Sequence, residues 1–383
     1  MSRKIRMGMV GGGRGAFIGN VHRMAAAMDG QIDLVGGVFS SDPEKSKASG
    51  SDLFLSPDRV YSSFEEMIIS EKKLPADQRM DLVSIVTPNH MHFKPAAMAI
   101  TNGFHVICDK PLCYNLEEAY ELQELVMHSD RIFALTHNYT GYPLVKQAKK
   151  MLRDGKLGEI RKVVVEYPQG WLSTLLEASD QKQAAWRTDP SRSGIAGAIG
   201  DIGTHAENLA EYITGLKITE LCADISTMVD GRKLDDDGNV LLRFENGARG
   251  ILYASQISAG EENNLRIRVY GEKGGLEWAQ MEPNTLIVRW AERPMEILRT
   301  GGPGLGPEAA AHTRIPAGHP EGYLEAFANI YRNVAKCIQA KDSGLEVDPL
   351  FKDFPDIKDG VRGMEFIYKV IESGKSTQKW LKL

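Results

Sequence analysis

The stretch Val10-Gly11-Gly12-Gly13-Arg14-Gly15-Ala16 decides the fold of this chain. It lies between a short apolar run, Ile5–Val10, which predicts a buried strand, and a pattern that predicts a helix. Glycine at such a point permits a tight turn and lets backbone N–H groups approach a pyrophosphate, while the helix amino terminus faces the negative charge. The stretch therefore predicts a cofactor-binding turn in the first unit of a Rossmann domain. The GxGxxG/A spacing is satisfied by Gly11, Gly13 and Ala16.

Further strands alternate with helical patterns in the first third of the chain, which predicts a parallel, doubly wound sheet. From about residue 160 the pattern changes to short strands with few helices between them, which is typical of an antiparallel sheet. We expect an α/β Rossmann domain over residues 1–140. An α+β domain with a large, mostly antiparallel open-faced sheet is expected over residues 141–383, with the C-terminal helix packing back on the first domain. The early strands are Ile32–Phe39, Asp81–Thr87, Phe104–Cys108 and Ile132–Thr136.

Helices predicted at about 190–214 and 320–340 would cover one face of the second sheet and leave its other face without cover. Sheet surface that is left bare favours association with another chain. We therefore expect a homo-oligomer, a dimer or a tetramer, that forms through the open face of this sheet.

Length and composition limit the class of protein. The chain has 383 residues, of which 42% are hydrophobic and 25% charged, enough for two domains with real cores. A formal net charge of −5 argues against a nucleic-acid partner and against an anionic membrane surface. No apolar run reaches about 18 residues, and the basic start of the chain is followed at once by glycines, unlike a signal peptide. The four cysteines form no CxxC pair, so we expect reduced thiols in a cytoplasmic protein.

The end of the second strand bears on the choice of cofactor. An acidic residue that binds the ribose is expected there, but the sequence reads Ser40-Ser41-Asp42. Ser40 suits either a ribose hydroxyl or a 2′-phosphate, Asp42 disfavours the phosphate, and Lys45 favours it. Because no arginine follows the strand, we expect NAD as the cofactor, and NADP stays open.

Three further motifs carry a resemblance to a known family. Thr87-Pro88-Asn89-His90-Met91-His92 follows the third strand, Asp109-Lys110-Pro111 follows the fourth, and Gly200-Asp201-Ile202-Gly203-Thr204-His205 opens a helix in the second half. In this order and spacing the chain resembles the Gfo/Idh/MocA oxidoreductases, the family of glucose–fructose oxidoreductase and inositol dehydrogenase. The resemblance covers nearly the whole chain. It implies a Rossmann domain that binds NAD or NADP and a sheet domain that supplies the substrate site and the oligomer contacts.

The resemblance also implies catalytic roles. Lys110 matches a lysine beside the nicotinamide and the substrate, and Asp201 and His205 match the acid/base pair. The chemistry agrees, because hydride transfer from a sugar carbon needs a base for the hydroxyl proton, and histidine titrates near neutral pH. Asp201 and His205 are four residues apart, so on a helix they share one face, and Lys110 can stabilise charge on the reacting oxygen. The leading hypothesis is an NAD(P)-dependent oxidoreductase acting on a secondary alcohol of a sugar, glycoside or cyclitol.

The chain departs from the family pattern in two places. The usual fingerprint is GxGxxGxxH, but here Gly19 and His22 follow as though three residues were inserted. Either Ala16 or Gly19 therefore packs under the pyrophosphate. Asp109 stands where the family usually has glutamate.

The wider site is predicted from the motifs and from the loops near them. His90 and His92 lack a third ligand, so no metal site is expected. Aromatic rings suit the apolar faces of a sugar, and an anionic group on the substrate would find Lys182, Arg187 and Arg192. The expected substrate-binding residues are Lys110, Tyr139, Tyr142, Trp171, Arg187, Asp201, His205, His319 and Tyr323. The expected cofactor-binding residues are Gly11, Gly13, Arg14, Ala16, Phe17, Ile18, Ser40, Ser41, Lys45, Thr87, Pro88, Asn89, His92, Asp109, Lys110, Asn138, Trp186 and Arg187.

Two other functions stay open. A redox-neutral, NAD-dependent glycosidase would oxidise the sugar, eliminate the aglycone, add water and reduce the sugar again with the same cofactor. A non-catalytic regulator would bind the dinucleotide without turnover. A dehydrogenase differs from both because it accumulates NADH when the substrate is present.

Overall fold

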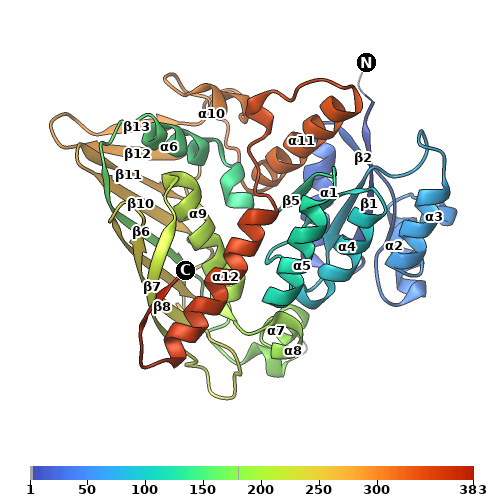
Figure 1. Ribbon diagram of the computed structural model, residues 1–383, viewed down its shortest axis with the longest axis horizontal. Helices are drawn as coiled ribbons and strands as arrows, with labels where there is room; N and C mark the ends of the chain where they lie inside the picture. The colour runs from blue at the N-terminus through green and yellow to red at the C-terminus, as the bar shows by residue number, and fades with distance from the viewer. Residues whose placement is uncertain (1–2, 180) are drawn as a thin grey trace. The chain divides into compact units, whose positions relative to one another are not determined.

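The computed structural model describes residues 3–179 and 181–383. The chain divides into two compact units (Figure 1). Unit 1 runs to Asn138 and resumes over Tyr323–Val361, and unit 2 comprises Tyr139–Gly322 and Arg362–Leu383. The first change of unit falls close to the boundary expected at residue 140. The segment Tyr323–Val361, however, was expected in the second domain and clusters with unit 1.

Unit 1 is built on a sheet of five parallel strands in the order β2-β1-β3-β4-β5. In this order β1 lies between β2 and β3, so the strand order reverses at β1, and ligands of such sheets bind at the carboxyl ends of the strands there. Both faces are covered, so the residues of β3 and β4 are buried without alternation. The strands are β1 (Ile5–Gly11), β2 (Ile32–Val38), β3 (Leu82–Val86), β4 (His105–Cys108) and β5 (Phe133–Leu135).

The helices of unit 1 lie on both faces of its sheet. α1 (Phe17–Met28) and α11 (Tyr323–Asp342) pack against each other and against β1, and the core on this face joins Met7 and Met9 of β1 to Phe327 and Tyr331 of α11. The right-handed crossovers place α3, α4 and α5 on the other face. These helices and their neighbours are α2 (Pro43–Asp52), α3 (Phe64–Lys73), α4 (Phe93–Thr101) and α5 (Leu116–Met127).

Unit 2 is built on a nine-stranded sheet in the order β13-β12-β11-β10-β6-β9-β8-β7-β14. The pair β6–β9 is parallel and the other neighbours are antiparallel, as the strand pattern predicts. The strands are β6 (Ile160–Pro168), β7 (Ile218–Ser226), β8 (Asp237–Phe244), β9 (Arg249–Ser255), β10 (Arg266–Gly271), β11 (Gly274–Ala279), β12 (Thr285–Trp290), β13 (Glu296–Arg299) and β14 (Trp380–Lys382).

Helices of unit 2 pack on one face of this sheet (Figure 1). Buried and exposed residues alternate along β8, which is the pattern of a strand with one covered and one open face. The helix α12 (Ile357–Lys375) passes from unit 1 into unit 2 at Val361–Arg362. The other helices of unit 2 are α6 (Pro143–Arg153), α7 (Lys182–Arg187), α8 (Pro190–Ser193), α9 (Thr204–Thr214) and α10 (Pro307–Ala311).

The single helix predicted over about 190–214 is wrong, because this segment contains three elements. α8 ends at Gly194, whose φ of 101° is reached easily only by glycine. A π-helical turn then runs over Ile199–Gly203 and leads directly into α9. Turns of this kind are rare and occur often at functional sites. Within the described ranges, moreover, no helix has both the length and the apolar character needed to cross a membrane.

Buried histidines give unit 1 a predicted dependence on pH. Burial lowers the pKa of His22 to about 4 and the pKa values of His105 and His137 to about 3. Below about pH 6.5 these histidines therefore bind protons in the unfolded chain but stay unprotonated in the folded unit. The free energy of unfolding falls as the pH falls from about 6.5 to about 4, by about 1.4 kcal/mol per pH unit for each histidine.

The variant His105→Gln tests this expectation, because Nδ1 of His105 accepts a hydrogen bond from the Ile132 N–H, at 2.8 Å, and must stay unprotonated. Urea denaturation at several pH values gives the free energy of unfolding as a function of pH, and its slope gives the number of protons taken up on unfolding. Below about pH 6.5 this number should be lower by about one in the variant than in the parent protein, whatever the absolute stability of the variant. His128→Gln is the matched control, because the His128 side chain is 80% exposed. An unchanged slope in His105→Gln would contradict the assignment.

Candidate active site

The glycine-rich turn after β1 is held by a contact that only glycine permits. A Cβ on Gly12 would lie 2.9 Å from the Cα of Gly19, and one on Gly19 would lie 2.3 Å from the Cα of Gly12. Gly12 also has a φ of 74°, in the left-handed region. The first residues of α1 are thereby packed directly on the turn. The sequence left open whether Ala16 or Gly19 packs under the pyrophosphate. In the structure Gly19 makes the close contact with the turn, and Ala16 is the residue that precedes the helix.

The turn is also tied to the end of β2. The Gly13 N–H donates to the carbonyl of Phe39 at 3.1 Å, and the Arg14 N–H donates to Oγ of Ser49 at 3.1 Å. The guanidinium of Arg14 forms an exposed ion pair with Asp52 of α2, with its Nε 2.6 Å from Oδ2. Backbone atoms, rather than this side chain, therefore form the inner surface of the turn.

In the residues that follow β2, side-chain oxygens accept hydrogen bonds from backbone N–H groups nearby in the sequence. Oγ of Ser40 accepts the Asp42 N–H at 3.1 Å. Asp42 caps α2 by accepting the N–H groups of Glu44 and Lys45. Ser40 stands where a carboxylate is usual in this fold, and the exposed Lys45 has its Nζ 3.9 Å from Oδ2 of Asp42.

The loops after β3 and β4 are joined by a buried imidazole. Nε2 of His92 lies 2.8 Å from the carbonyl of Thr87, and its Nδ1 lies 2.9 Å from the carbonyl of Pro111. Burial lowers the pKa of His92. Asn89, in the turn between these residues, is 5% exposed. The ring of His92 therefore bridges the two loops that carry the Thr87–His92 and Asp109–Pro111 motifs.

Asp109 is an enclosed carboxylate beside Lys110. Its Oδ1 accepts the hydroxyl of Thr136 at 2.7 Å and the Lys110 N–H at 3.0 Å. Burial acts to raise the pKa of Asp109, but its electrostatic interactions with His22 and Lys110 and the hydrogen bond from the Thr136 hydroxyl outweigh it, so the pKa lies below its ordinary value. A fixed negative charge therefore lies next to the Lys110 ammonium.

Two observations fit a dinucleotide at this edge of unit 1. The turn after β1 presents bare backbone at the amino end of α1, as a pyrophosphate requires. After β5, the buried Nδ2 of Asn138 has no hydrogen-bond partner among residues 3–179 and 181–383. An amide donor left unsatisfied at the carboxyl end of a strand is suited to a ligand oxygen.

In unit 2, the π-turn presents Asp201 and α9 presents His205. Oδ2 of Asp201 accepts Nε2 of Gln256 at 2.9 Å and lies 3.3 Å from Nε of Arg187. The ring of His205, which is 6% exposed, meets the ring of Tyr139 edge to face at 4.8 Å. The structure therefore gives Asp201 two nitrogen neighbours and packs His205 against an aromatic wall.

The guanidinium of Arg187 contacts aromatic rings with its planar faces and polar groups with its nitrogen atoms. Its guanidinium carbon lies 4.3 Å from the ring centre of Trp186 and 6.0 Å from that of Trp171. Its Nη1 donates to Oε1 of Gln183 at 2.5 Å. The cofactor and substrate candidates Trp171, Trp186 and Arg187 thus form one cluster with Asp201.

Sequence reasoning missed a row of amide side chains near this cluster. Gln169 accepts Nε1 of Trp171 at 3.0 Å and Nε2 of Gln256 at 3.4 Å. Nε2 of Gln169 donates to Oδ1 of Asn263, which also accepts the hydroxyl of Tyr167 at 2.8 Å. No spacing rule identifies glutamine or asparagine from separate strands. The only signal in the sequence was their position at the ends of predicted strands.

Asp235 is a second residue that the sequence did not reveal. Its two carboxylate oxygens accept the N–H groups of Gly197 at 2.6 Å and Ile199 at 2.8 Å, and its carbonyl accepts the N–H of Ala198 at 2.9 Å. Burial raises the pKa of Asp235, while these N–H groups act to lower it. Asp235 therefore anchors the start of the segment that carries Asp201.

Other substrate candidates have different surroundings. Tyr142 is 1% exposed and packs against Trp278, with ring centres 5.1 Å apart, so its ring belongs to the core of unit 2. His319 lies in an exposed turn, where its Nδ1 is 3.2 Å from the carbonyl of Pro316. Tyr323 opens α11 in unit 1 and packs on Phe327.

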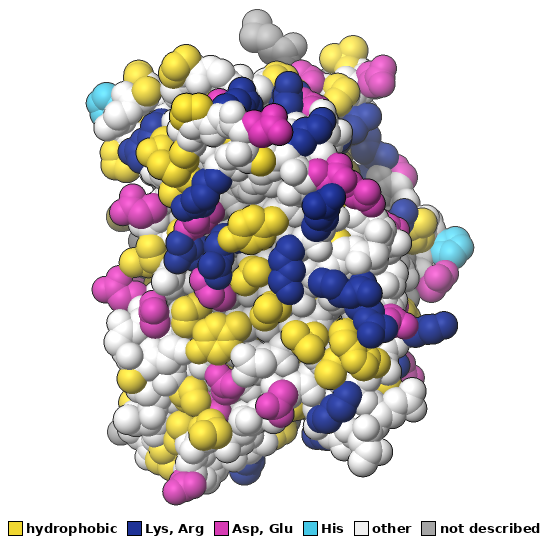
Figure 2. All heavy atoms as spheres, turned by 90° about the vertical axis from the view of Figure 1, so that its left-hand side faces the viewer, with side chains coloured by type: hydrophobic (Ala, Val, Ile, Leu, Met, Phe, Trp, Pro, Cys, Tyr) yellow, Lys and Arg dark blue, Asp and Glu magenta, His cyan; other side chains and the backbone are white. Residues whose placement is uncertain are grey.

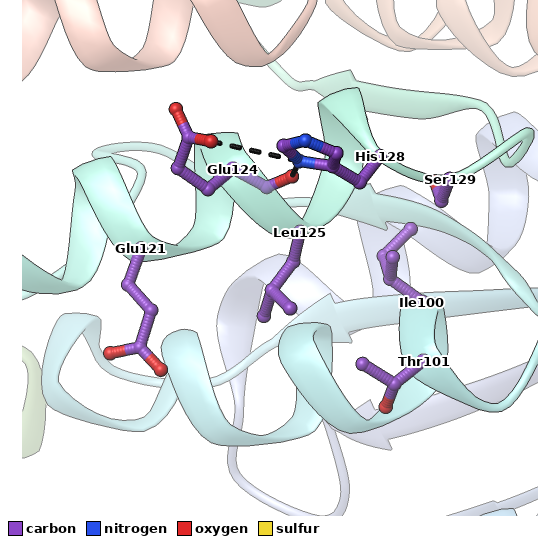
Figure 3. A pocket seen from close by; sticks show the side chains of 7 residues that line it. All are labelled: Ile100, Thr101, Glu121, Glu124, Leu125, His128 and Ser129. Atoms are coloured by element: carbon purple, nitrogen blue, oxygen red, sulfur yellow. Dashed lines mark hydrogen bonds and ion pairs between the residues drawn. The ribbon is translucent and has the colours of Figure 1, made fainter.

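A groove elsewhere on unit 1 has no connection to this chemistry. It is lined by the carboxyl-terminal part of α4 and by α5 with the two residues that follow it (Figure 3). Its polar members include Glu124 and His128, which form an exposed pair 3.6 Å apart. The lining residues are Ile100, Thr101, Glu121, Glu124, Leu125, His128 and Ser129.

Comparison with known proteins gives the family. A model of the oxidoreductase family with an NAD-binding Rossmann fold matches residues 5–137, and a model of the Gfo/Idh/MocA C-terminal domain matches residues 145–277. The chain is 26% identical to levoglucosan dehydrogenase of Pseudarthrobacter phenanthrenivorans, over 92% of this chain and 93% of that protein.

Two solved structures are similar over almost their whole length. An oxidoreductase from Sinorhizobium meliloti is 47% identical, with a TM-score of 0.90 over 99% of this chain and 100% of that one. An inositol dehydrogenase homologue from Azotobacter vinelandii, in complex with NADH and myo-inositol, is 34% identical, with a TM-score of 0.92 over 100% and 98%. This chain therefore belongs to the Gfo/Idh/MocA oxidoreductases, and its first unit is their NAD-binding Rossmann fold.

Proposed function

We propose that the protein is an NAD-dependent dehydrogenase that oxidises a secondary alcohol of a neutral cyclitol or sugar. The observation that carries the proposal is the arrangement around Asp201 and His205 in unit 2. There the acid/base pair is bordered by phenol, indole and amide groups, which hydrogen-bond hydroxyls or pack on the apolar face of a ring. The complex of the Azotobacter homologue with myo-inositol supports this substrate class.

Each of the three catalytic residues has a distinct role in the proposal. Bound NAD supplies the hydride acceptor. The imidazole of His205 takes the proton of the reacting hydroxyl, and Asp201, held by Gln256, orients that imidazole or a neighbouring hydroxyl of the substrate. The Lys110 ammonium donates to the reacting oxygen and stabilises the negative charge that develops on it.

The rival expectation, an anionic sugar, depends on Arg187 being available to a carboxylate or phosphate. The guanidinium of Arg187 instead lies 3.3 Å from Asp201, and its faces lie over Trp186 and Trp171. An anionic substrate would have to compete with the carboxylate of Asp201 for this cation. A neutral polyol needs no such exchange, which is why we favour it.

Removal of either reacting side chain tests the catalytic roles. His205→Asn should lower kcat by about 10²–10⁴-fold because the general base is lost. Lys110→Met should lower it by about 10²–10³-fold because the charge on the reacting oxygen is no longer stabilised. NADH formation under saturating conditions gives kcat, and calorimetry gives NAD affinity, which His205→Asn should leave nearly unchanged. The matched control is His128→Asn, which changes an exposed histidine in the groove of Figure 3. Full turnover by either folded catalytic variant would refute its assigned role.

A substrate panel decides among the three functions that the sequence left open. Cyclitols, neutral sugars, sugar acids and aryl glycosides are incubated with NAD, and NADH and released aglycone are followed together. The proposal expects NADH to accumulate with a neutral polyol. Aglycone released without net NADH would show the glycosidase instead, and NAD binding without turnover of any compound would favour the regulator.

The open face of the sheet in unit 2 supports the proposed homo-oligomer. In register across neighbouring strands, Leu241 of β8 pairs with Ile251 of β9, and Ile251 pairs with Val164 of β6. Leu241 is 48% and Ile251 37% exposed. Ion pairs such as Arg268–Glu166 lie beside this apolar row. Figure 2 shows hydrophobic side chains interspersed with charged ones on this face, a composition suited to a second copy of the chain.

The double substitution Leu241→Glu and Ile251→Glu should shift the protein from an oligomer to a monomer, because like charges would meet across the apolar row. Light scattering coupled to gel filtration measures the mass at several protein concentrations. Met127→Glu is the matched control, since Met127 is exposed on α5 of unit 1. A monomeric parent protein, or a double variant that keeps the oligomer, would contradict this interface.

A further inference from the structure

A buried chain of polar groups in unit 1 connects α11 to the active-site carboxylate. Oγ of Ser84, in the middle of β3, lies 2.7 Å from the hydroxyl of Tyr331. That hydroxyl lies 2.7 Å from Nδ1 of His22, and Nε2 of His22 lies 3.9 Å from Oδ1 of Asp109. Ser84, His22 and Tyr331 are all fully buried. No motif in the sequence pointed to Tyr331, which lies far along the chain from Asp109.

We propose that Tyr331 is a positioning residue, whose hydroxyl donates to Nδ1 of His22 and so keeps the Nε2–H of that ring turned toward Asp109. The proposal deepens the proposed function, because Asp109 is the fixed charge beside Lys110. Its physical basis is the orientation of two hydrogen bonds, and it concerns side chains of unit 1 alone.

His22 has one ring proton to place. Burial lowers the pKa of His22 to about 4, so the imidazole is neutral at neutral pH and carries a single N–H. If Nδ1 carried that proton, the lone pair of Nε2 would face the ionised carboxylate of Asp109, which is unfavourable at 3.9 Å in a buried site. With the proton on Nε2, the N–H dipole faces the carboxylate instead.

Tyr331 completes this arrangement because a phenol can both donate and accept. With the His22 proton on Nε2, the Tyr331 hydroxyl donates to the bare Nδ1 and accepts the hydroxyl of Ser84, so both contacts of 2.7 Å are satisfied. Edge-to-face packing fixes the imidazole, with the Phe327 ring centre at 5.0 Å and the Tyr331 ring centre at 5.8 Å. Asp109 thus selects the tautomer, and Tyr331 stabilises it by its hydrogen bond to Nδ1 and holds the ring in place.

The expected consequence reaches Lys110 through Asp109. The Nε2–H dipole, the Thr136 hydroxyl and the Lys110 N–H all favour the ionised form of the Asp109 carboxylate. Loss of one of these contributions makes protonation of the carboxylate easier, and a neutral Asp109 no longer presents a fixed negative charge beside Lys110. Tyr331→Phe should therefore reduce turnover in a manner that depends on pH.

The direct test uses nitrogen NMR on the full chain with labelled histidine, and the His22 signal is assigned by its loss in His22→Gln. The proposal expects Nε2 protonated and Nδ1 unprotonated in the parent protein, and in Tyr331→Phe an Nδ1 resonance that moves toward that of a ring nitrogen without a hydrogen bond. Protonated Nδ1 in the parent protein would overturn it. This readout needs no substrate, so it stands even if the proposed dehydrogenase activity fails.

The kinetic test separates positioning from simple loss of packing. Tyr331→Phe should lower kcat about ten-fold and move the acid limb of its pH profile upward, with little change in the KM for NAD. In Tyr331→Phe the Ser84 hydroxyl loses its hydrogen bond to Tyr331. A companion double variant, Ser84→Ala with Tyr331→Phe, removes that hydroxyl as well. If the companion recovers full activity, the unsatisfied Ser84 explains the loss and positioning is refuted. If the defect and the shifted profile persist, positioning is supported. Tyr120→Phe, on the half-exposed side chain of α5, is the matched control.

Discussion

The close contact between Gly12 and Gly19 is the constraint on which the nucleotide unit depends. Since no Cβ fits at either position, the first turn of α1 lies directly on the end of β1. Arg23 secures the same turn by donating to the carbonyl of Gly12 at 2.7 Å. His22 follows Gly19 by one helical turn, so the packing that exposes backbone to a pyrophosphate also fixes where the imidazole meets Tyr331. One steric requirement thus serves both cofactor binding and the network behind Asp109.

In unit 2 an equivalent constraint comes from a carboxylate. Asp235 satisfies two backbone N–H groups at the start of the π-turn, where a helix would otherwise leave them without partners. Its neighbour Asp236 pairs with the buried guanidinium of Arg232, 3.2 Å away, and Arg232 donates to the carbonyl of Leu172 at 2.8 Å. The loop beyond Trp171 is thereby tied to the segment that carries Asp201. The residues around Asp201 and His205 are held by a small buried network rather than by a continuous helix.

The sequence predicted the features that have local causes. The glycine turn, the alternation of strands and helices and the change to an antiparallel sheet follow from short-range patterns, and the family motifs supplied Lys110, Asp201 and His205. Features that depend on distant partners were not predictable. Only the folded chain brings α11 back onto β1, and Gly194 and Asp235 divide the helix expected over 190–214. Gln169, Gln256 and Asn263 come from separate strand ends, so no spacing in the sequence joins them.

The net charge of −5 says little about the substrate, because the charges near Asp201 are arranged in compensating pairs. Arg187 is neutralised by Asp201, and Arg232 is neutralised by Glu177 and Asp236. Between these pairs lie amides, whose donors and acceptors bond to one another at little electrostatic cost. A polyol can replace such bonds one for one, whereas an anion would have to separate a paired cation from its partner. The pairing of charges, and not their sum, is what favours an uncharged ring.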